Sequence, residues 1–77
     1  MTTLYFHCAD TREVLLDRSG SEVEDMYDVR ARAFQVIQAI ITLAGPQDWR
    51  EWNVHVRDDE GEEHLVVPFA SVLGKPH

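Results

Sequence analysis

Three of the four histidines of this 77-residue chain fall on positions whose side chains we expect to share one surface. His7, His55 and His64 each lie in a stretch that alternates between apolar and polar residues, as expected for strands with one buried face. Imidazoles that converge from neighbouring strands could bind zinc, copper or nickel. The chain has no closely spaced ligand motif, however. A solvated polar sheet face and a dimer interface are therefore the competing interpretations of the same residues.

Other side chains share this predicted surface, which we call the open face, meaning the side of the sheet that faces away from the helix. Cross-strand neighbours in an antiparallel sheet lie close enough to act together. The interaction face that we predict consists of Tyr5, His7, Asn53, His55, Arg57, His64 and Val66.

A long amphipathic helix, predicted over residues 25–44, must cover the other side of the sheet. At about 100° per residue its apolar side chains form one broad arc. Asp25 can cap the start, and Gly45 followed by Pro46 ends the helix. The arc comprises Met26, Val29, Ala33, Val36, Ile37, Ile40, Ile41, Leu43 and Ala44, with Tyr27 and Phe34 at one margin.

Four strands are predicted around this helix, over residues 3–8, 13–17, 52–58 and 63–69, followed by a tail over 70–77. The element order is β-β-α-β-β within one domain, residues 1–77. If the strands are fully antiparallel and the crossover is right-handed, the strand order is 2-1-3-4. The predicted fold is α+β, a two-layer sandwich in which a four-stranded antiparallel sheet carries one long helix on one face.

Composition limits the classes of partner. The net charge of −7 disfavours binding to nucleic acid and to anionic membrane surfaces. Charged and polar residues interrupt the helix, so it is no membrane span. We see no signal peptide, and a cytoplasmic location is the simplest expectation. The single cysteine, Cys8, excludes an internal disulfide.

Catalytic chemistry finds little support in the sequence. Cys8 falls on the inward side of its strand, and no nucleophile, base and orienting group form a recognisable set. The acidic run Asp58–Glu63 lacks the ligand spacing of an EF-hand calcium loop. We therefore predict that the protein is not an enzyme and uses no cofactor.

Two further residues carry specific expectations. Arg30 is a charge inside the apolar arc, and we expect its stem to pack while its head reaches the rim or a carboxylate such as Asp10 or Asp17. Trp49 should either cover one end of the core or lie partly exposed.

An ordered set of residues resembles a family of short bacterial proteins of unknown function. In the N-terminal half the set is Tyr5-Phe6-His7, Asp10, Asp17, Gly20, Asp25, Arg30-Ala31 and Ala33. In the C-terminal half it is Trp52-x-Val54-x-Val56, Asp58 to Gly61, and Leu65-x-Val67-Pro68-Phe69. The chain departs from the family pattern at Thr11 and Arg32. The resemblance implies a small cytoplasmic bacterial protein and no particular chemistry.

Three functional hypotheses follow. The first is a non-catalytic protein-interaction or regulatory module that binds a protein partner or a second copy through the open face or the strand edges. The second is a metal-binding protein that uses His7, His55 and His64. The third is an antitoxin-like nucleic-acid regulator with a basic patch at Arg12, Arg18, Arg30 and Arg32, which rests on fold analogy and is opposed by the acidic charge.

Overall fold

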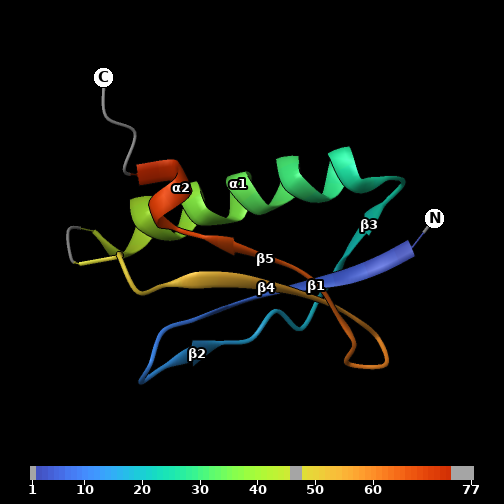
Figure 1. Ribbon diagram of the computed structural model, residues 1–77, viewed down its shortest axis with the longest axis horizontal. Helices are drawn as coiled ribbons and strands as arrows, with labels where there is room; N and C mark the ends of the chain where they lie inside the picture. The colour runs from blue at the N-terminus through green and yellow to red at the C-terminus, as the bar shows by residue number, and fades with distance from the viewer. Residues whose placement is uncertain (1, 46–47, 74–77) are drawn as a thin grey trace.

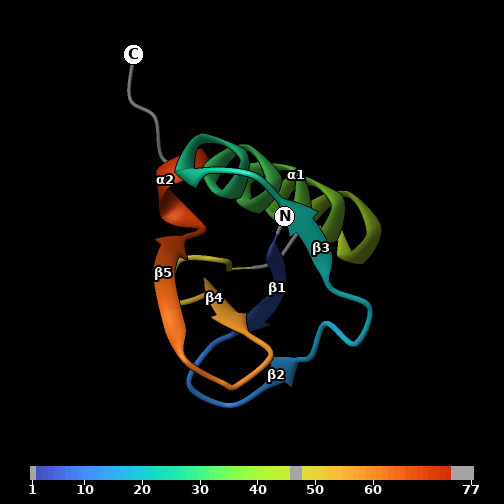
Figure 2. The same ribbon diagram turned by 90° about the vertical axis from the view of Figure 1, so that its right-hand side faces the viewer.

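A computed structural model describes residues 2–45 and 48–73 (Figure 1). The elements follow one another as β1 (Thr2–Ala9), β2 (Val14–Leu15), β3 (Ser21–Val23), α1 (Met26–Ala44), β4 (Asn53–Asp58), β5 (Glu63–Pro68) and α2 (Ala70–Leu73). The predicted class is confirmed, because one antiparallel sheet carries one long helix on one of its faces (Figure 2).

The sheet is organised around β1, which pairs along its length with β4, and β4 pairs with β5. The order β2-β1-β4-β5 matches the predicted order 2-1-3-4. The alternation of β1 explains its central place, since Leu4, Phe6 and Cys8 are buried under α1 while the residues between them are only half-buried.

The sheet has five strands, so the prediction of four was wrong in one respect. Residues 21–23 were predicted to belong to the connection before the helix. They form β3 instead and pair with Thr2–Leu4. The second predicted strand, 13–17, is reduced to β2, which pairs only with Cys8 and Ala9. The two short strands thus share the edge of β1 opposite to β4. Pairing with β1 overrides the weak strand preference of Ser21 and Glu22, and Val23 joins the core.

The long helix begins where the sequence predicts. The Asp25 carboxylate accepts a hydrogen bond from the Asp28 amide at 2.9 Å, and Gly45 (φ 85°) donates from its amide to the Ile41 carbonyl at 3.0 Å. Pro46 lies outside the described residues. Ser21 and Glu24 have the types and spacing of a second capping box, but they start no earlier turn, because Ser21 belongs to β3.

The buried stripe of α1 is narrower than the predicted arc. Val29, Ala33 and Ile37 are buried at a spacing of four residues, and Val36, Ile40 and Ile41 flank them. Met26, Leu43 and Ala44 are exposed, contrary to expectation. A helix that packs on a single layer buries a stripe rather than half of its circumference.

One end of the core is closed by an aromatic cluster. The ring of Trp49 packs against the rings of Trp52 and Phe69, with centroids 5.5 Å apart in both pairs. All three side chains are buried, so the first of the two expectations for Trp49 is confirmed. Phe69 lies just before α2, a short helix in the segment predicted as a tail. Residues 74–77 of that segment lie outside the described part of the chain.

Candidate functional site

The open face brings together most of the predicted interaction residues. His7 of β1 is directly opposite His55 of β4, and His55 is opposite Val66 of β5. Tyr5 and Arg57 form the next pair of β1 and β4. Asn53 lies on the same side of β4, two residues before His55. Six of the seven predicted residues therefore share one surface.

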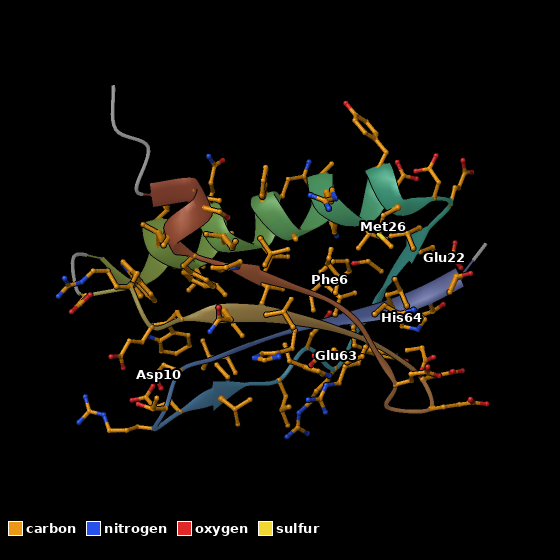
Figure 3. All side chains as sticks on the ribbon, viewed as in Figure 1. Phe6, Asp10, Glu22, Met26, Glu63 and His64 are labelled. Carbon is orange, nitrogen blue, oxygen red and sulfur yellow. The ribbon has the colours of Figure 1, made fainter. Side chains whose placement is uncertain are left out.

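His64 is the exception. A β-bulge opposite Val56 and Arg57 places Glu63, not His64, in the cross-strand position facing Arg57. One extra residue in a strand reverses the alternation of side chains. His64 therefore lies on the helix side, where it lines a hollow with Leu4 and Met26. Figure 3 shows Glu63 farther from α1 and His64 nearer to Met26.

The bulge also separates the three imidazoles on which the alternative, metal-binding hypothesis depends. The His64 Nε2 atom lies 2.9 Å from Asp58 Oδ2, while His7 and His55 remain on the open face. Within residues 2–45 and 48–73, no group of three or more His, Cys, Asp or Glu side chains is arranged to hold a metal ion. The expected convergence of His7, His55 and His64 was therefore wrong.

Glu63 links His55 and Arg57 of the open face instead. Its Oε1 atom lies 3.0 Å from His55 Nδ1 and 3.4 Å from Arg57 Nη2. The hydrogen bond with His55 is the main reason why the pKa of Glu63 is below its ordinary value, and the Arg57 charge adds to the effect. A carboxylate thus balances part of the positive charge that β4 brings to this surface.

His7 is held in place by the segment between β2 and β3. The Asp17 amide donates a hydrogen bond to His7 Nδ1 at 3.0 Å. In the neutral ring the remaining proton is therefore on Nε2. The Tyr5 ring lies almost parallel to the imidazole, with an interplanar angle of 9° and centroids 6.2 Å apart. These contacts fix the orientation of His7 on the open face.

The Asp17 carboxylate fills the gap that β2 and β3 leave along β1. It accepts hydrogen bonds from the backbone amides of Phe6 at 3.1 Å, Ser19 at 3.0 Å and Gly20 at 3.1 Å. Burial acts to raise the pKa of Asp17, but these amide donors outweigh it and hold the pKa below its ordinary value. We expected this carboxylate only as a partner for Arg30. The Asp17-x-Ser19-Gly20 spacing, typical of a side-chain-capped turn, was the signal that could have revealed its role.

Gly20 completes this turn from the side of the open face. Its φ is +75°, in the left-handed region that favours glycine. A Cβ atom at this position would lie 2.9 Å from Thr3 Cγ2 and 3.0 Å from Tyr5 Cε2. The missing side chain therefore leaves room for the ring of Tyr5.

A hollow opens beside the two paired histidines. It has a volume of about 160 Å³ and is lined by His7, Ala9, Val14, Leu16, His55 and Arg57. Val14 is 56 % exposed and Leu16 is 57 % exposed. These two apolar residues were not among the predicted interaction residues, because three consecutive apolar residues in the predicted strand 13–17 show no alternation that would assign a side.

The other residues that the sequence singled out, among them Cys8 and Arg30, lie outside the open face. Cys8 is buried as predicted, and burial, with a smaller contribution from the Asp17 charge, raises the pKa of its thiol to about 11. Arg30 is exposed, and the carboxylates of Asp10 and Asp17 accept bonds from backbone amides instead. Arg32, on the far side of α1 from Arg30 by helix geometry, donates to Ser21 Oγ.

The described helices include none that is both long enough and apolar enough to cross a membrane. No curated protein and no solved structure shows significant similarity to the chain. One family model matches residues 3–70, which is nearly the whole chain, and it describes a domain of unknown function (DUF6894). This match agrees with the resemblance to a family of uncharacterised short proteins, and the chain therefore belongs to the DUF6894 family.

Proposed function

We propose that the protein is a non-catalytic interaction module that binds a protein partner through the open face. The observation that carries the proposal is the hollow beside His7 and His55, where the exposed side chains of Val14 and Leu16 adjoin fixed polar groups. Protein-binding surfaces combine apolar anchors with polar groups of defined orientation in this way.

The dimensions of the hollow indicate what it would accept. A cavity of about 150 Å³ can hold a molecule as large as benzene, so 160 Å³ is enough for one aliphatic or aromatic side chain. The Arg57 guanidinium in the wall, which Glu63 balances only in part at 3.4 Å, would favour a partner that places a hydrogen-bond acceptor next to that side chain. A protein surface with one apolar anchor beside a hydrogen-bond acceptor is therefore the partner that we propose.

A non-catalytic role is supported by the state of the reactive groups. The Cys8 thiol is buried and its raised pKa keeps it protonated at neutral pH. In the described part of the chain, the hydrogen bonds of the three strand imidazoles join them to carboxylates or to a backbone amide. These bonds orient the rings and offer no activated nucleophile. We place this module in the cytoplasm, where a free thiol is stable.

Affinity capture with variants of the hollow tests the proposal. Leu16→Asp puts a charge into the apolar wall, whereas Leu43→Asp places the same change on an exposed position of α1. We expect at least one protein to be captured by the wild type and by Leu43→Asp but not by Leu16→Asp. The protein so identified should then bind purified wild-type protein with a Kd at least tenfold lower than that of Leu16→Asp.

Equal capture of every protein by both variants would overturn the proposal. Both variants must first show the circular dichroism spectrum and unfolding midpoint of the wild type, so that loss of binding does not reflect loss of fold.

A further inference from the structure

A second surface lies along β5, which forms the edge of the sheet on the side away from β1. Its inner hydrogen bonds go to β4, and the Phe69 amide continues them by donating to the Trp52 carbonyl at 2.9 Å. Backbone groups in an antiparallel pair face the partner at every second residue. Val67 and Leu65 therefore also face β4, and the amide and carbonyl of Val66 face outward.

Both ends of this edge are protected against pairing. Pro68 has no amide proton, and at the other end Glu63 and the bulge interrupt the regular strand. Charges, prolines and bulges are the devices that keep edge strands from pairing. Between them, Leu65 to Val67 remain regular, and the Val66 side chain is 39 % exposed. The protection therefore leaves one short segment and one register for pairing.

We infer that this edge pairs with the same edge of a second copy, antiparallel and centred on Val66. In this register Val66 meets its own copy, Leu65 meets Val67, and His64 meets Pro68, so no like charges are opposed. The two Val66 residues exchange a pair of hydrogen bonds, and the missing amide of Pro68 falls at the margin. The inference goes beyond the proposed function, because it concerns the backbone edge of β5 and a second copy of the chain, although the Val66 side chain also belongs to the open face.

Charge favours the antiparallel arrangement over a parallel one. The chain carries a net charge of −7, and five acidic residues lie in the turn between β4 and β5 or next to it, namely Asp58, Asp59, Glu60, Glu62 and Glu63. Antiparallel pairing puts the two acidic turns at opposite ends of the joined strands. Parallel pairing would place them side by side, where they would repel one another.

The helix above β5 supplies apolar surface on the same side of the molecule. Ile41 of α1 and Val72 of α2 line a common hollow, so this flank of α1 faces α2, which follows β5. Phe34 and Tyr27 precede Ile41 by steps of two helical turns and lie on the same flank. They are 44 % and 80 % exposed, respectively. A second copy joined at β5 would bring its own Phe34 and Tyr27 across the two-fold axis.

Sedimentation equilibrium from low to high micromolar concentration tests the inference. We expect a reversible dimer for the wild type. Val66→Pro removes the outward amide and should raise the dimer Kd at least tenfold, because two intersubunit hydrogen bonds are lost. Val66→Thr keeps the amide and the branched side chain, and it should dimerise like the wild type. Phe34→Glu should weaken the dimer without touching β5.

Two further variants separate this inference from the proposed function and from misfolding. Leu16→Asp alters the hollow of the open face at the opposite side of the sheet from β5 and should leave the dimer unchanged. Val66→Cys should form an intermolecular disulfide on mild oxidation, because directly paired residues lie within disulfide range, whereas Val14→Cys should not. A wild type that is monomeric at every concentration, or a dimer that Val66→Pro and Phe34→Glu leave intact, would overturn the inference.

Discussion

Replacement of Asp17 by Asn should destabilise the protein, although the two side chains have nearly the same shape. Both carboxylate oxygens are in use, since Oδ2 accepts from the Phe6 amide and Oδ1 accepts from the Ser19 and Gly20 amides. An asparagine has only one acceptor oxygen, so its NH₂ group must face either the Phe6 amide or the turn. One partly buried bond to a charge is thereby lost.

The size of the effect follows from that bond. A hydrogen bond to a charged group contributes about 1.5–3 kcal/mol, and partial exposure to water places Asp17 in the lower part of this range. We therefore expect Asp17→Asn to lower the free energy of unfolding by about 2 kcal/mol. In a domain of this size the melting temperature should then fall by about 10 °C. Urea unfolding followed by tryptophan fluorescence measures the change.

Asp10→Asn is the matched control. The Asp10 carboxylate also accepts two backbone amides, from Arg12 and Glu13, but both bonds go to the single atom Oδ1. An asparagine can keep both, so the free energy of unfolding should stay close to that of the wild type.

The pH dependence gives an independent test of the same bond. Because the folded-state pKa of Asp17 lies below its ordinary value of 3.8, its stabilisation is complete above that value and is lost as the pH falls through the folded pKa. The stabilities of the wild type and of Asp17→Asn should therefore converge in strong acid. Equal stability of the two proteins at pH 7, or a difference that persists unchanged at low pH, would refute the reasoning.

Two other predictions concern Gly20 and Cys8. In Gly20→Ala the new Cβ atom would lie 2.9 Å from Thr3 Cγ2 at a residue with positive φ, and the variant should lose about 2–3 kcal/mol of stability. Gly61 has a similar φ, but a Cβ atom there would meet nothing within 4 Å, so Gly61→Ala should lose about 1 kcal/mol. Denaturant unfolding of both variants checks this, and equal losses would contradict a steric role for the Tyr5 and Thr3 contacts. Burial raises the pKa of the Cys8 thiol to about 11. Because less thiolate is then present at pH 8, the thiol should react with iodoacetamide about 100-fold more slowly in the folded than in the unfolded protein. Because the folded pKa is raised, the contribution of the thiol to stability should be constant below about pH 9, its ordinary pKa, and should fall as the pH rises toward 11. Rapid labelling of the native protein would show that Cys8 is accessible.

Long periodic segments made the main elements of the fold predictable from the sequence. Two signals were sufficient to predict the fold class and the order of the principal strands. One is the alternation of Leu4, Phe6 and Cys8, and the other is the apolar spacing of α1 together with its cap at Asp25. The strand β3 could not be predicted, because Ser21 and Glu22 have no strand pattern of their own and pair only because β1 offers a free edge.

The candidate surface was less predictable because its composition depends on a single extra residue. Strict alternation places His64 beside His55, and the bulge next to Arg57 exchanges it for Glu63. No local signal in the sequence marks the site of this bulge. The role of Asp17 also depends on an encounter between distant segments, since its carboxylate meets the Phe6 amide across the gap between two short strands.

The central position of β1 has a consequence for the order of folding. β1 leaves the ribosome before β4 and obtains this long partner only when β4 has been synthesised, because Leu4 pairs with Asp58 and Ala9 with Asn53. Until then only the short strands β2 and β3 can shield one of its edges. Sheets dominated by pairs so distant in sequence fold slowly, because the cost of closing the loop precedes the gain from the contacts. The nascent chain therefore carries an unpaired hydrophobic strand for most of its synthesis, and this interval is when the protein is most exposed to aggregation and to chaperones.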